Sequence, residues 1–281
     1  MSEWFSHGEK IQKIPVDDRG LQYGDGIFET LAIRDGRPRF WGMHCERLVL
    51  GCERLGIAAP STTLLRSEVA DAIQQAYIDH TFASAKIVIT AGCGRRGYRR
   101  PESMEPAIYI WVGHAPRLPK ESYQHGVEVT MCVTRLAIQP SLAGVKSLNR
   151  LEQVLARSEW QDDTIFEGLM LDTEERLICG TMSNVFIVSA KSVSTPALTR
   201  CGVAGVMRRH VLETMARDNL NCEVRDIRHD ELLQADEVFL TNSQFGILPV
   251  NQCGSDGWAV GETTLAVMNG ADLVEKPERS A

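Results

Sequence analysis

Hydrophobic and polar positions along the chain predict a mixture of strands and helices. Short apolar runs bounded by polar or glycine-rich turns predict strands at residues 26–33, 85–90 and 107–113. Apolar side chains that recur at helical spacing predict helices at residues 43–57 and 64–77. These elements follow one another without a regular βαβ alternation, which favours an α+β fold.

A polar segment with two prolines, residues 114–126, predicts a linker between two domains. We therefore expect a small α+β domain over residues 1–115 and a larger α+β domain over residues 116–281. In the larger domain the pattern predicts short strands and one helix. The strands are expected at residues 127–133, 167–172, 184–189 and 237–243, and the helix at residues 205–217.

Composition narrows the class of protein. The chain has 281 residues, of which 43% are hydrophobic and 24% charged, as in ordinary globular proteins. A net charge of −7 without a basic stripe argues against nucleic acid and anionic membranes as partners. No apolar run approaches the roughly 20 residues of a spanning helix, and the N-terminus lacks an apolar signal region, so we expect a cytoplasmic protein. The eight cysteines form no CxxC pair, so neither a disulfide framework nor a zinc or other metal site is predicted.

One lysine, Lys146, precedes a segment in which Leu148, Leu151, Val154 and Leu155 recur at helical spacing. A lysine at a helix start is usually a solvated surface residue, and the positive end of the helix dipole disfavours it. A lysine that is buried has a lowered pKa and becomes nucleophilic, which suits Schiff-base chemistry. The position of Lys146 therefore indicates a functional amine.

Two further segments favour phosphate binding. In GVAGVMRRHV (202–211), Gly205 precedes an amphipathic helix whose first N–H groups can receive an anion, although an ordinary glycine-rich turn also explains the pattern. In LTNSQFGILPV (240–250), Thr241 and Ser243 can donate hydroxyl hydrogen bonds at the end of a strand. A nucleophilic lysine together with a phosphate site suggests pyridoxal phosphate (PLP).

The segment GCGRRG (92–97) matches the GxGxxG pattern but continues into YRRPES, where a proline opposes the helix that a dinucleotide site requires. Two explanations stay open for this segment. It is either a cationic loop near an anionic substrate or a solvated hairpin loop.

Six segments occur in the order found in fold-type IV PLP enzymes, and the chain resembles that superfamily over nearly its whole length. The resemblance implies the two-domain fold of D-amino-acid aminotransferase-like enzymes, with the active site between the domains, and a homodimer. Within the superfamily, KSLNRLEQVLAR and the GRRGY loop look most like the aminodeoxychorismate lyases. The six segments are DRGLQYGDGIFET (18–30), HCERL (44–48), GVKSLNRLEQVLAR (144–157), GTMSNVFIV (180–188), GVAGVMR (202–208) and LTNSQFGILPV (240–250).

The resemblance implies a role for individual residues. Lys146 is expected to carry the cofactor and move protons, and Arg47 to contact the cofactor phosphate. Arg96 and Tyr98 are expected to meet the carboxylates of the substrate. The remaining residues expected to bind the cofactor are Asn149, Cys179, Gly205, Val206, Met207, Asn242 and Ser243.

The sequence departs from the family pattern at two positions. Cys179 stands where the family has a glutamate, five residues before Asn184, which pairs with the pyridine nitrogen of the cofactor. Ala91 stands where a Thr-Arg-Gly motif has its arginine, and this change is expected to remove a substrate contact. Both departures bear on activity and neither bears on the fold.

The activity that the resemblance implies is conversion of 4-amino-4-deoxychorismate to 4-aminobenzoate and pyruvate, a step of folate biosynthesis. Two other functions stay open. One is transamination by a fold-type IV aminotransferase of the D-amino-acid or branched-chain type. The other is binding without catalysis, which the loss of the glutamate at Cys179 supports.

Overall fold

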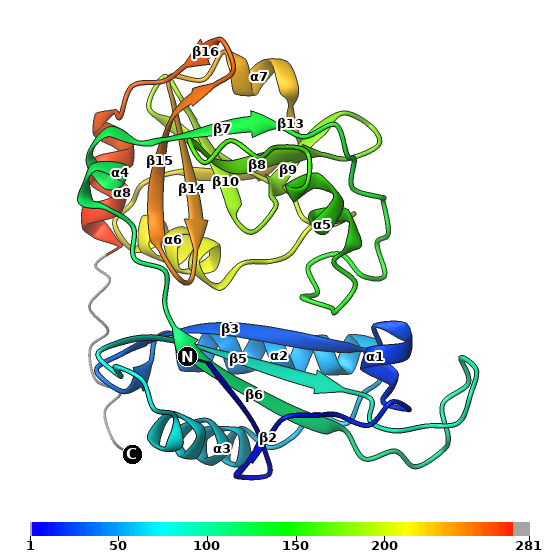
Figure 1. Ribbon diagram of the computed structural model, residues 1–281. Helices are drawn as coiled ribbons and strands as arrows, with labels where there is room; N and C mark the ends of the chain where they lie inside the picture. The colour runs from blue at the N-terminus through cyan, green and yellow to red at the C-terminus, as the bar shows by residue number, and fades with distance from the viewer. Residues whose placement is uncertain (1, 272–281) are drawn as a thin grey trace. The chain divides into compact units, whose positions relative to one another are not determined.

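The computed structural model describes residues 2–271, which divide into two compact units. The first unit comprises residues 1–116 and 145–149, and the second comprises residues 117–144 and 150–281. Figure 1 traces both units along the chain. Within the described residues, no helix is both long and apolar enough to cross a membrane.

The first unit is a six-stranded sheet with two long helices on one face. Its strand order is β2-β1-β6-β5-β3-β4. The strands are β1 (Glu3–Ser6), β2 (Glu9–Ile11), β3 (Gly26–Arg34), β4 (Arg37–Pro38), β5 (Phe82–Thr90) and β6 (Ala107–His114), and the helices are α1 (Arg19–Tyr23), α2 (Trp41–Leu55) and α3 (Thr62–Gln75).

Alternation along β3 and β5 separates the two faces of this sheet. Ile27, Leu31 and Ile87 point to the core that α2 and α3 cover (Figure 1). The opposite face carries Phe28 and Lys86. The predicted strands at residues 26–33, 85–90 and 107–113 and both predicted helices of this part are confirmed.

The segment that contains Lys146 belongs to the first unit, and the expectation that it belongs to the second domain is wrong. The reason is backbone pairing with β3. Phe28 N–H donates to the Lys146 carbonyl at 3.0 Å, and Leu148 N–H donates to the Gly26 carbonyl at 2.9 Å. Helix α5 (Leu151–Arg157) begins only at Leu151. Lys146 thus lies on an extended segment beside β3 and not at a helix start. The positive end of a helix dipole therefore does not disfavour its charge, contrary to the expectation from the sequence.

The second unit is built on a ten-stranded mixed sheet of order β12-β11-β10-β14-β15-β7-β8-β9-β13, with β16 paired to β15. Helices α6 and α8 pack against β14. The strands are β7 (Val127–Met131), β8 (Ile165–Leu171), β9 (Arg176–Gly180), β10 (Asn184–Ser189), β11 (Ser192–Pro196), β12 (Cys222–Arg225), β13 (Ile227–Arg228), β14 (Glu237–Asn242), β15 (Gly246–Cys253) and β16 (Asp256–Gly257). The helices are α4 (Lys120–His125), α5, α6 (Val206–Arg217), α7 (His229–Leu233) and α8 (Glu262–Gly270).

Two expectations for this part need correction. The polar segment 114–126 is not an unstructured linker, because it contains α4, which packs against β15, and the division between units falls after Pro116. The apolar side of α5 is not buried: Leu151, Val154 and Leu155 are 77%, 60% and 60% exposed.

Candidate active site

Lys146 lies beside an aromatic ring that a second lysine also contacts. Its Nζ is 4.3 Å from the centroid of the Phe28 ring, and the Nζ of Lys86 is 4.7 Å from the same centroid. Antiparallel pairing puts Lys146 and Phe28 on one face, and Lys86 reaches that face from β5. Burial lowers the pKa of Lys86. This face of the first unit therefore presents two amines around one aromatic ring.

Arg47 is held by a buried carboxylate. Glu29 on β3 is 1% exposed and accepts a hydrogen bond from Arg47 Nε at 2.7 Å and from Arg47 Nη2 at 2.5 Å. The other partner of Glu29 is His44 Nδ1, at 2.6 Å. Burial raises the pKa of Glu29, but Arg47 and His44 outweigh burial and bring it down to about 2. Glu29 is thus ionised at neutral pH and fixes the guanidinium of Arg47 on α2.

His44 completes this buried group. Burial lowers the pKa of His44, more than its bond to Glu29 raises it, so the ring is neutral at pH 7. Its Nε2 is buried and has no hydrogen-bond partner within residues 2–271. A buried polar atom without a partner is rare, and it is compatible with a ligand atom or a water at this place.

In the second unit, the start of α6 has the properties of a phosphate cradle. Gly205 is its N-cap and no side chain caps the first turn, so the N–H groups of Val206 and Met207 have no capping partner within the described chain. Both residues are buried, so their side chains do not offer a surface to a ligand. A Cβ at Gly205 would come within 2.0 Å of Asn184 Oδ1, so only glycine allows this approach.

Thr241 supports the same interpretation. It is opposite Asn184 in the β10–β14 register, so both side chains lie on one face of the sheet. Its Oγ1 is buried and has no hydrogen-bond partner in the described part of the chain. The N–H groups of α6, this hydroxyl and the helix dipole suit a phosphate, so the residues fit the phosphate end of PLP.

The loop 181–183 is hydrogen-bonded to a buried carboxyl group, that of Glu167. Glu167 accepts hydrogen bonds from the N–H groups of Thr181 and Met182 at 3.1 Å each and from Ser183 Oγ at 2.8 Å. Burial raises the pKa of Glu167. Asn242 Nδ2 in turn donates to the Met182 carbonyl at 2.5 Å. Ser243, in the β14–β15 hairpin, follows directly.

Cys179 lies on β9 in an apolar cluster with Cys132, Met170 and Cys201. Burial raises the pKa of its thiol, so Cys179 is neutral at pH 7. None of the eight cysteines, all of which are among the described residues, forms a disulfide. At this position a thiol gives the site neither the charge nor the hydrogen-bonding strength of a carboxylate.

The four other positions of the first unit that the sequence analysis singled out differ in their surroundings. Arg96 and Tyr98 are exposed on the β5–β6 loop. Asn149 donates to the Gly24 carbonyl at 3.4 Å and packs on the end of α1, where it helps to hold the lysine segment. Ala91 is 4% exposed in the core under α2 and α3, so the idea that its change removes a substrate contact is not supported.

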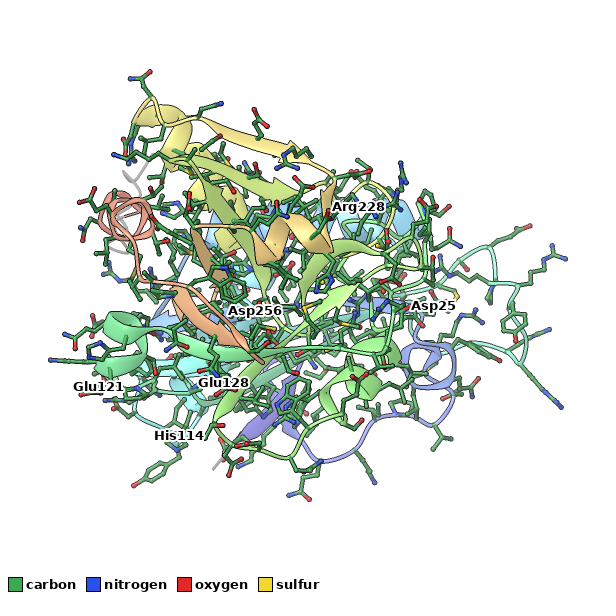
Figure 2. The ribbon with its side chains drawn as sticks, turned by 90° about the horizontal axis from the view of Figure 1, so that it is seen from above. Asp25, His114, Glu121, Glu128, Arg228 and Asp256 are labelled. Atoms are coloured by element: carbon green, nitrogen blue, oxygen red, sulfur yellow. The ribbon has the colours of Figure 1, made fainter. Side chains whose placement is uncertain are left out.

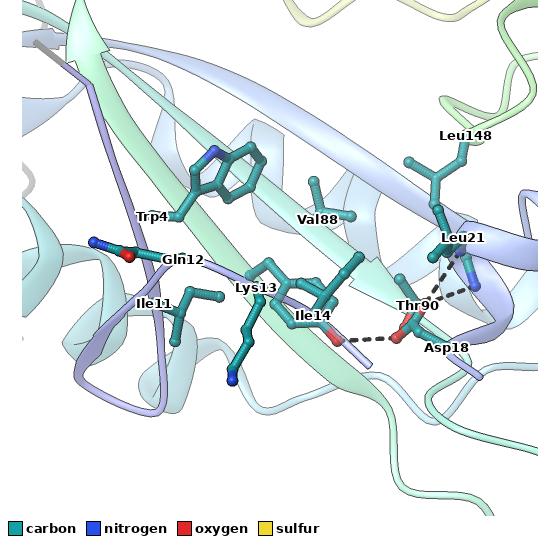
Figure 3. A pocket seen from close by; sticks show the side chains of 12 residues that line it. Trp4, Ile11, Gln12, Lys13, Ile14, Asp18, Leu21, Val88, Thr90 and Leu148 are labelled. Atoms are coloured by element: carbon teal, nitrogen blue, oxygen red, sulfur yellow. Dashed lines mark hydrogen bonds between the residues drawn. The ribbon is translucent and has the colours of Figure 1, made fainter. Parts of the chain in front are cut away.

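The first unit also has an apolar pocket of about 350 Å³ that neither Lys146 nor Arg47 lines. Figure 3 shows Trp4, Ile14, Leu21 and Val88 around it. Asp18 lies at one end and accepts hydrogen bonds from Thr90 Oγ1 at 2.8 Å and Tyr109 Oη at 3.0 Å. Its carboxylate is committed to protein partners, and the lining residues include neither Lys146 nor Arg47.

Sequence reasoning missed Glu29, His44, Lys86 and Glu167. Glu29 and His44 lie within the segments GDGIFET and HCERL. Each is a polar residue at a position where the periodicity of its strand or helix predicts a buried apolar side chain, and this mismatch could have identified them. Lys86 interrupts an apolar strand in the same way. A polar residue inside a core pattern is the general signal for such groups.

Comparison with known proteins identifies two similar lyases, one by sequence and one by structure. The chain is 38% identical to the aminodeoxychorismate lyase of Vibrio harveyi over 239 residues, 85% of this chain and 86% of that protein. The crystal structure of 4-amino-4-deoxychorismate lyase from Pseudomonas aeruginosa matches with a TM-score of 0.87 and 44% identity, covering 95% of this chain and 97% of that one.

A more distant structure shares the fold alone. The PLP-bound form of a hypothetical aminotransferase from Mycobacterium tuberculosis matches with a TM-score of 0.77 and 19% identity, over 97% of this chain and 98% of that one. The family model described as amino-transferase class IV matches residues 26–253, which include Lys146, Arg47 and the start of α6. By its sequence, its fold and the residues gathered in its two units, the chain belongs to the amino-transferase class IV family.

Proposed function

We propose that this chain is a PLP-dependent lyase that converts 4-amino-4-deoxychorismate to 4-aminobenzoate and pyruvate. The observation that carries the proposal is 44% identity to the Pseudomonas aeruginosa lyase over 95% of the chain. The similar lyase of Vibrio harveyi supports it from sequence alone. The chemistry of the residues described above is compatible with the same reaction.

Each unit contains residues that would bind PLP. Lys146 would hold it covalently. Its phosphate would be met by Arg47, by the N–H groups of Val206 and Met207 and by the hydroxyls of Thr241 and Ser243. A charge-assisted hydrogen bond from Arg47 would stabilise the phosphate, while Nε and Nη2 of Arg47 donate to Glu29. Asn149, Cys179, Gly205 and Asn242 would line the cofactor.

When bound, PLP supplies an electron sink for the substrate carbon that bears nitrogen. The Lys146 amine would take the proton from that ring carbon. The carbon–oxygen bond to the enolpyruvyl group then breaks, and Lys146 would return a proton to the departing enol, which becomes pyruvate. The ring becomes aromatic, so the atoms balance without an oxidant. Lys86, Arg96 and Tyr98 would bind the two carboxylates of the substrate.

The proposal is tested by mixing purified protein, PLP and 4-amino-4-deoxychorismate and measuring both products. Wild type should release 4-aminobenzoate and pyruvate in equal amounts. Lys146→Ala should abolish both and should lose the covalent link, read as the absence of a cofactor mass on peptide 144–157 after borohydride treatment. Lys120→Ala, an exposed lysine of α4, is the control. A Lys146→Ala protein that keeps the link would show that another amine holds the cofactor.

Transamination is the second candidate, favoured by membership of a family named for it. A screen of amino donors and keto acids separates the two. Conversion of bound PLP to its amine form, without release of 4-aminobenzoate, would overturn the lyase proposal. PLP binding with neither reaction would instead support a protein that has lost catalysis, as the thiol at Cys179 would allow.

We also propose that two copies of the chain form a homodimer. The support is the exposed apolar side of α5, where Leu151, Val154 and Leu155 are 77%, 60% and 60% exposed. Exposed apolar patches of this kind mark interfaces in soluble proteins.

A further inference from the structure

The β5–β6 connection, residues 91–106, carries the exposed Arg96 and Tyr98 and contains no helix or named strand, although every residue in it is described. In Figure 1 it extends away from the end of the first sheet. Long irregular loops are usually mobile, because ordering each residue costs conformational entropy. The contacts that hold this loop therefore determine how the side chains of Arg96 and Tyr98 are presented.

A single buried guanidinium holds the tip of the loop. Arg19 is 3% exposed. Its Nη1 donates to the Gly97 carbonyl at 2.8 Å and its Nη2 to the Tyr98 carbonyl at 3.0 Å. Its Nε donates to Asp25 Oδ2 at 2.8 Å. The planar fork of an arginine thus fixes two successive carbonyls of the loop against one carboxylate.

Asp25 holds the far side of the loop through a second arginine. Arg100 donates from Nε to Asp25 Oδ2 at 3.0 Å. Its Nη1 donates to the carbonyls of Leu55 at 2.5 Å and Gly56 at 2.9 Å, at the end of α2. Asp25, labelled in Figure 2, therefore joins two guanidinium groups. One of them, that of Arg19, holds the loop at residues 97 and 98, and the other belongs to Arg100 of the loop itself.

Tyr23 adds a third contact. Its Oη accepts from Gly97 N–H at 2.9 Å, and its ring meets the Tyr98 ring edge-on at 5.5 Å. The guanidinium of Arg19 lies over the same Tyr23 ring at 4.8 Å. At the start of the loop, Arg19 N–H donates to the Gly92 carbonyl at 2.9 Å. The backbone is thus anchored at residues 92, 97 and 98, and the Arg100 side chain anchors the loop beyond them, while the side chains of Arg95, Arg96 and Arg99 stay exposed.

We propose that Arg19 is a positioning residue for substrate binding. With Asp25 and Arg100, it presets the backbone that carries Arg96 and Tyr98 for a substrate with two carboxylates. The inference rests on the proposed function, because that function supplies the dicarboxylate. Arg19 is buried and does not itself meet the substrate. Because the loop is ordered on folding, substrate binding does not have to order it, which favours affinity.

The test compares Arg19→Lys, which keeps the charge but loses the fork, with Arg99→Gln, an exposed arginine of the same loop. For Arg19→Lys we expect KM to rise about tenfold, with kcat within twofold and PLP affinity unchanged. Amide hydrogen exchange at residues 95–100 of the unliganded protein should become at least tenfold faster. Arg99→Gln should leave exchange unchanged. If Arg19→Lys does not fold, Tyr23→Phe removes only the acceptor of Gly97 N–H and should shift exchange and KM in the same direction.

Two outcomes would overturn the inference. One is unchanged exchange or unchanged KM in Arg19→Lys while Arg96→Gln raises KM. The other is a joint loss of kcat, PLP affinity and thermal stability, which would give Arg19 a purely structural role. Failure of the proposed function looks different: wild type releases no pyruvate, or Arg96→Gln leaves KM unchanged. The exchange experiment needs no substrate and decides the positioning step in that case.

Discussion

At the scale of single residues, Arg47 gives the most direct test of the cofactor assignment. Glu29 holds the Arg47 guanidinium through hydrogen bonds from Nε and Nη2, and the cofactor assignment pairs the positive charge of that guanidinium with the phosphate. Charge-assisted hydrogen bonds contribute roughly 1.5–3 kcal/mol each. We therefore predict that Arg47→Ala weakens PLP binding at least tenfold, since about 1.4 kcal/mol is a factor of ten. Equilibrium titration of the apoprotein with PLP measures it, and Arg54→Ala, exposed on the same helix, is the control. Equal affinities in the two variants would place the phosphate elsewhere.

Cys179 leads to a prediction about reaction type. A neutral thiol cannot keep a proton on the ring nitrogen as a carboxylate does, so the cofactor draws electrons less strongly. Transamination should suffer more, because its substrate must hold negative charge until it is reprotonated at another site. In an elimination that ends in an aromatic ring, the negative charge leaves with the departing group at once. We predict that Cys179→Glu raises any transaminase side activity more than lyase activity, both measured on one preparation, with Cys179→Gln as the uncharged control. A larger gain for the lyase would contradict this.

Residues differed in how far sequence could predict them. Lys146 and Arg47 stand in recognisable motifs. Arg19 and Glu29 act through partners that are distant in sequence: Arg19 meets Gly97, and Glu29 meets Arg47. Local patterns contain no information about such pairs, because only the register of the β3–β5 pairing and the packing of α2 bring them together.

At the scale of elements, the start of α6 is the feature whose geometry is most restrictive. A Cβ at Gly205 would lie 2.0 Å from Asn184 Oδ1, and Asn184 also donates to the Val203 carbonyl at 2.9 Å. Gly205→Ala must therefore displace Asn184 or the helix start. We predict a loss of about 1–3 kcal/mol in the free energy of unfolding and weaker PLP binding. Chemical denaturation and titration measure the two effects.

Gly42→Ala is the matched control for Gly205→Ala. Gly42 is within α2, and a Cβ there would meet no atom within 4 Å. Alanine has the higher helix propensity, so this variant should be as stable as wild type or more so. If Gly205→Ala behaves like Gly42→Ala, the contact with Asn184 does not restrict the helix start.

Elements with a clear period were predictable, and short or context-dependent ones were not. The patterns for α2, α3, β3 and β5 gave the right type of element because one side of each faces a core. The strand β15 was not predicted, because it contains Gly246 and Pro249, residue types that favour turns, yet tertiary pairing with β14 and β7 keeps it extended. The lysine segment was assigned to the wrong unit because its pairing with β3 is a long-range contact.

At the scale of the whole molecule, the exposed side of α5 makes the oligomeric state testable. Sequence periodicity predicted an apolar side for this helix, and the structure leaves it in solvent, with Leu155 60% exposed. Intrachain packing therefore does not account for these side chains, whereas a second copy of the chain would. In a twofold dimer each substitution acts twice.

We predict that Leu155→Glu shifts the chain from dimer to monomer. Burying a leucine contributes about 1.5 kcal/mol or more, and two copies per dimer imply that the dissociation constant rises at least about a hundredfold. Light scattering after size-exclusion chromatography, over a dilution series, measures the change. Leu64→Glu, at a leucine of α3 that is 45% exposed, is the control and should stay dimeric. A wild-type chain that is monomeric at micromolar concentration, or a Leu155→Glu protein that dimerises as wild type does, would show that the apolar side of α5 is not the interface.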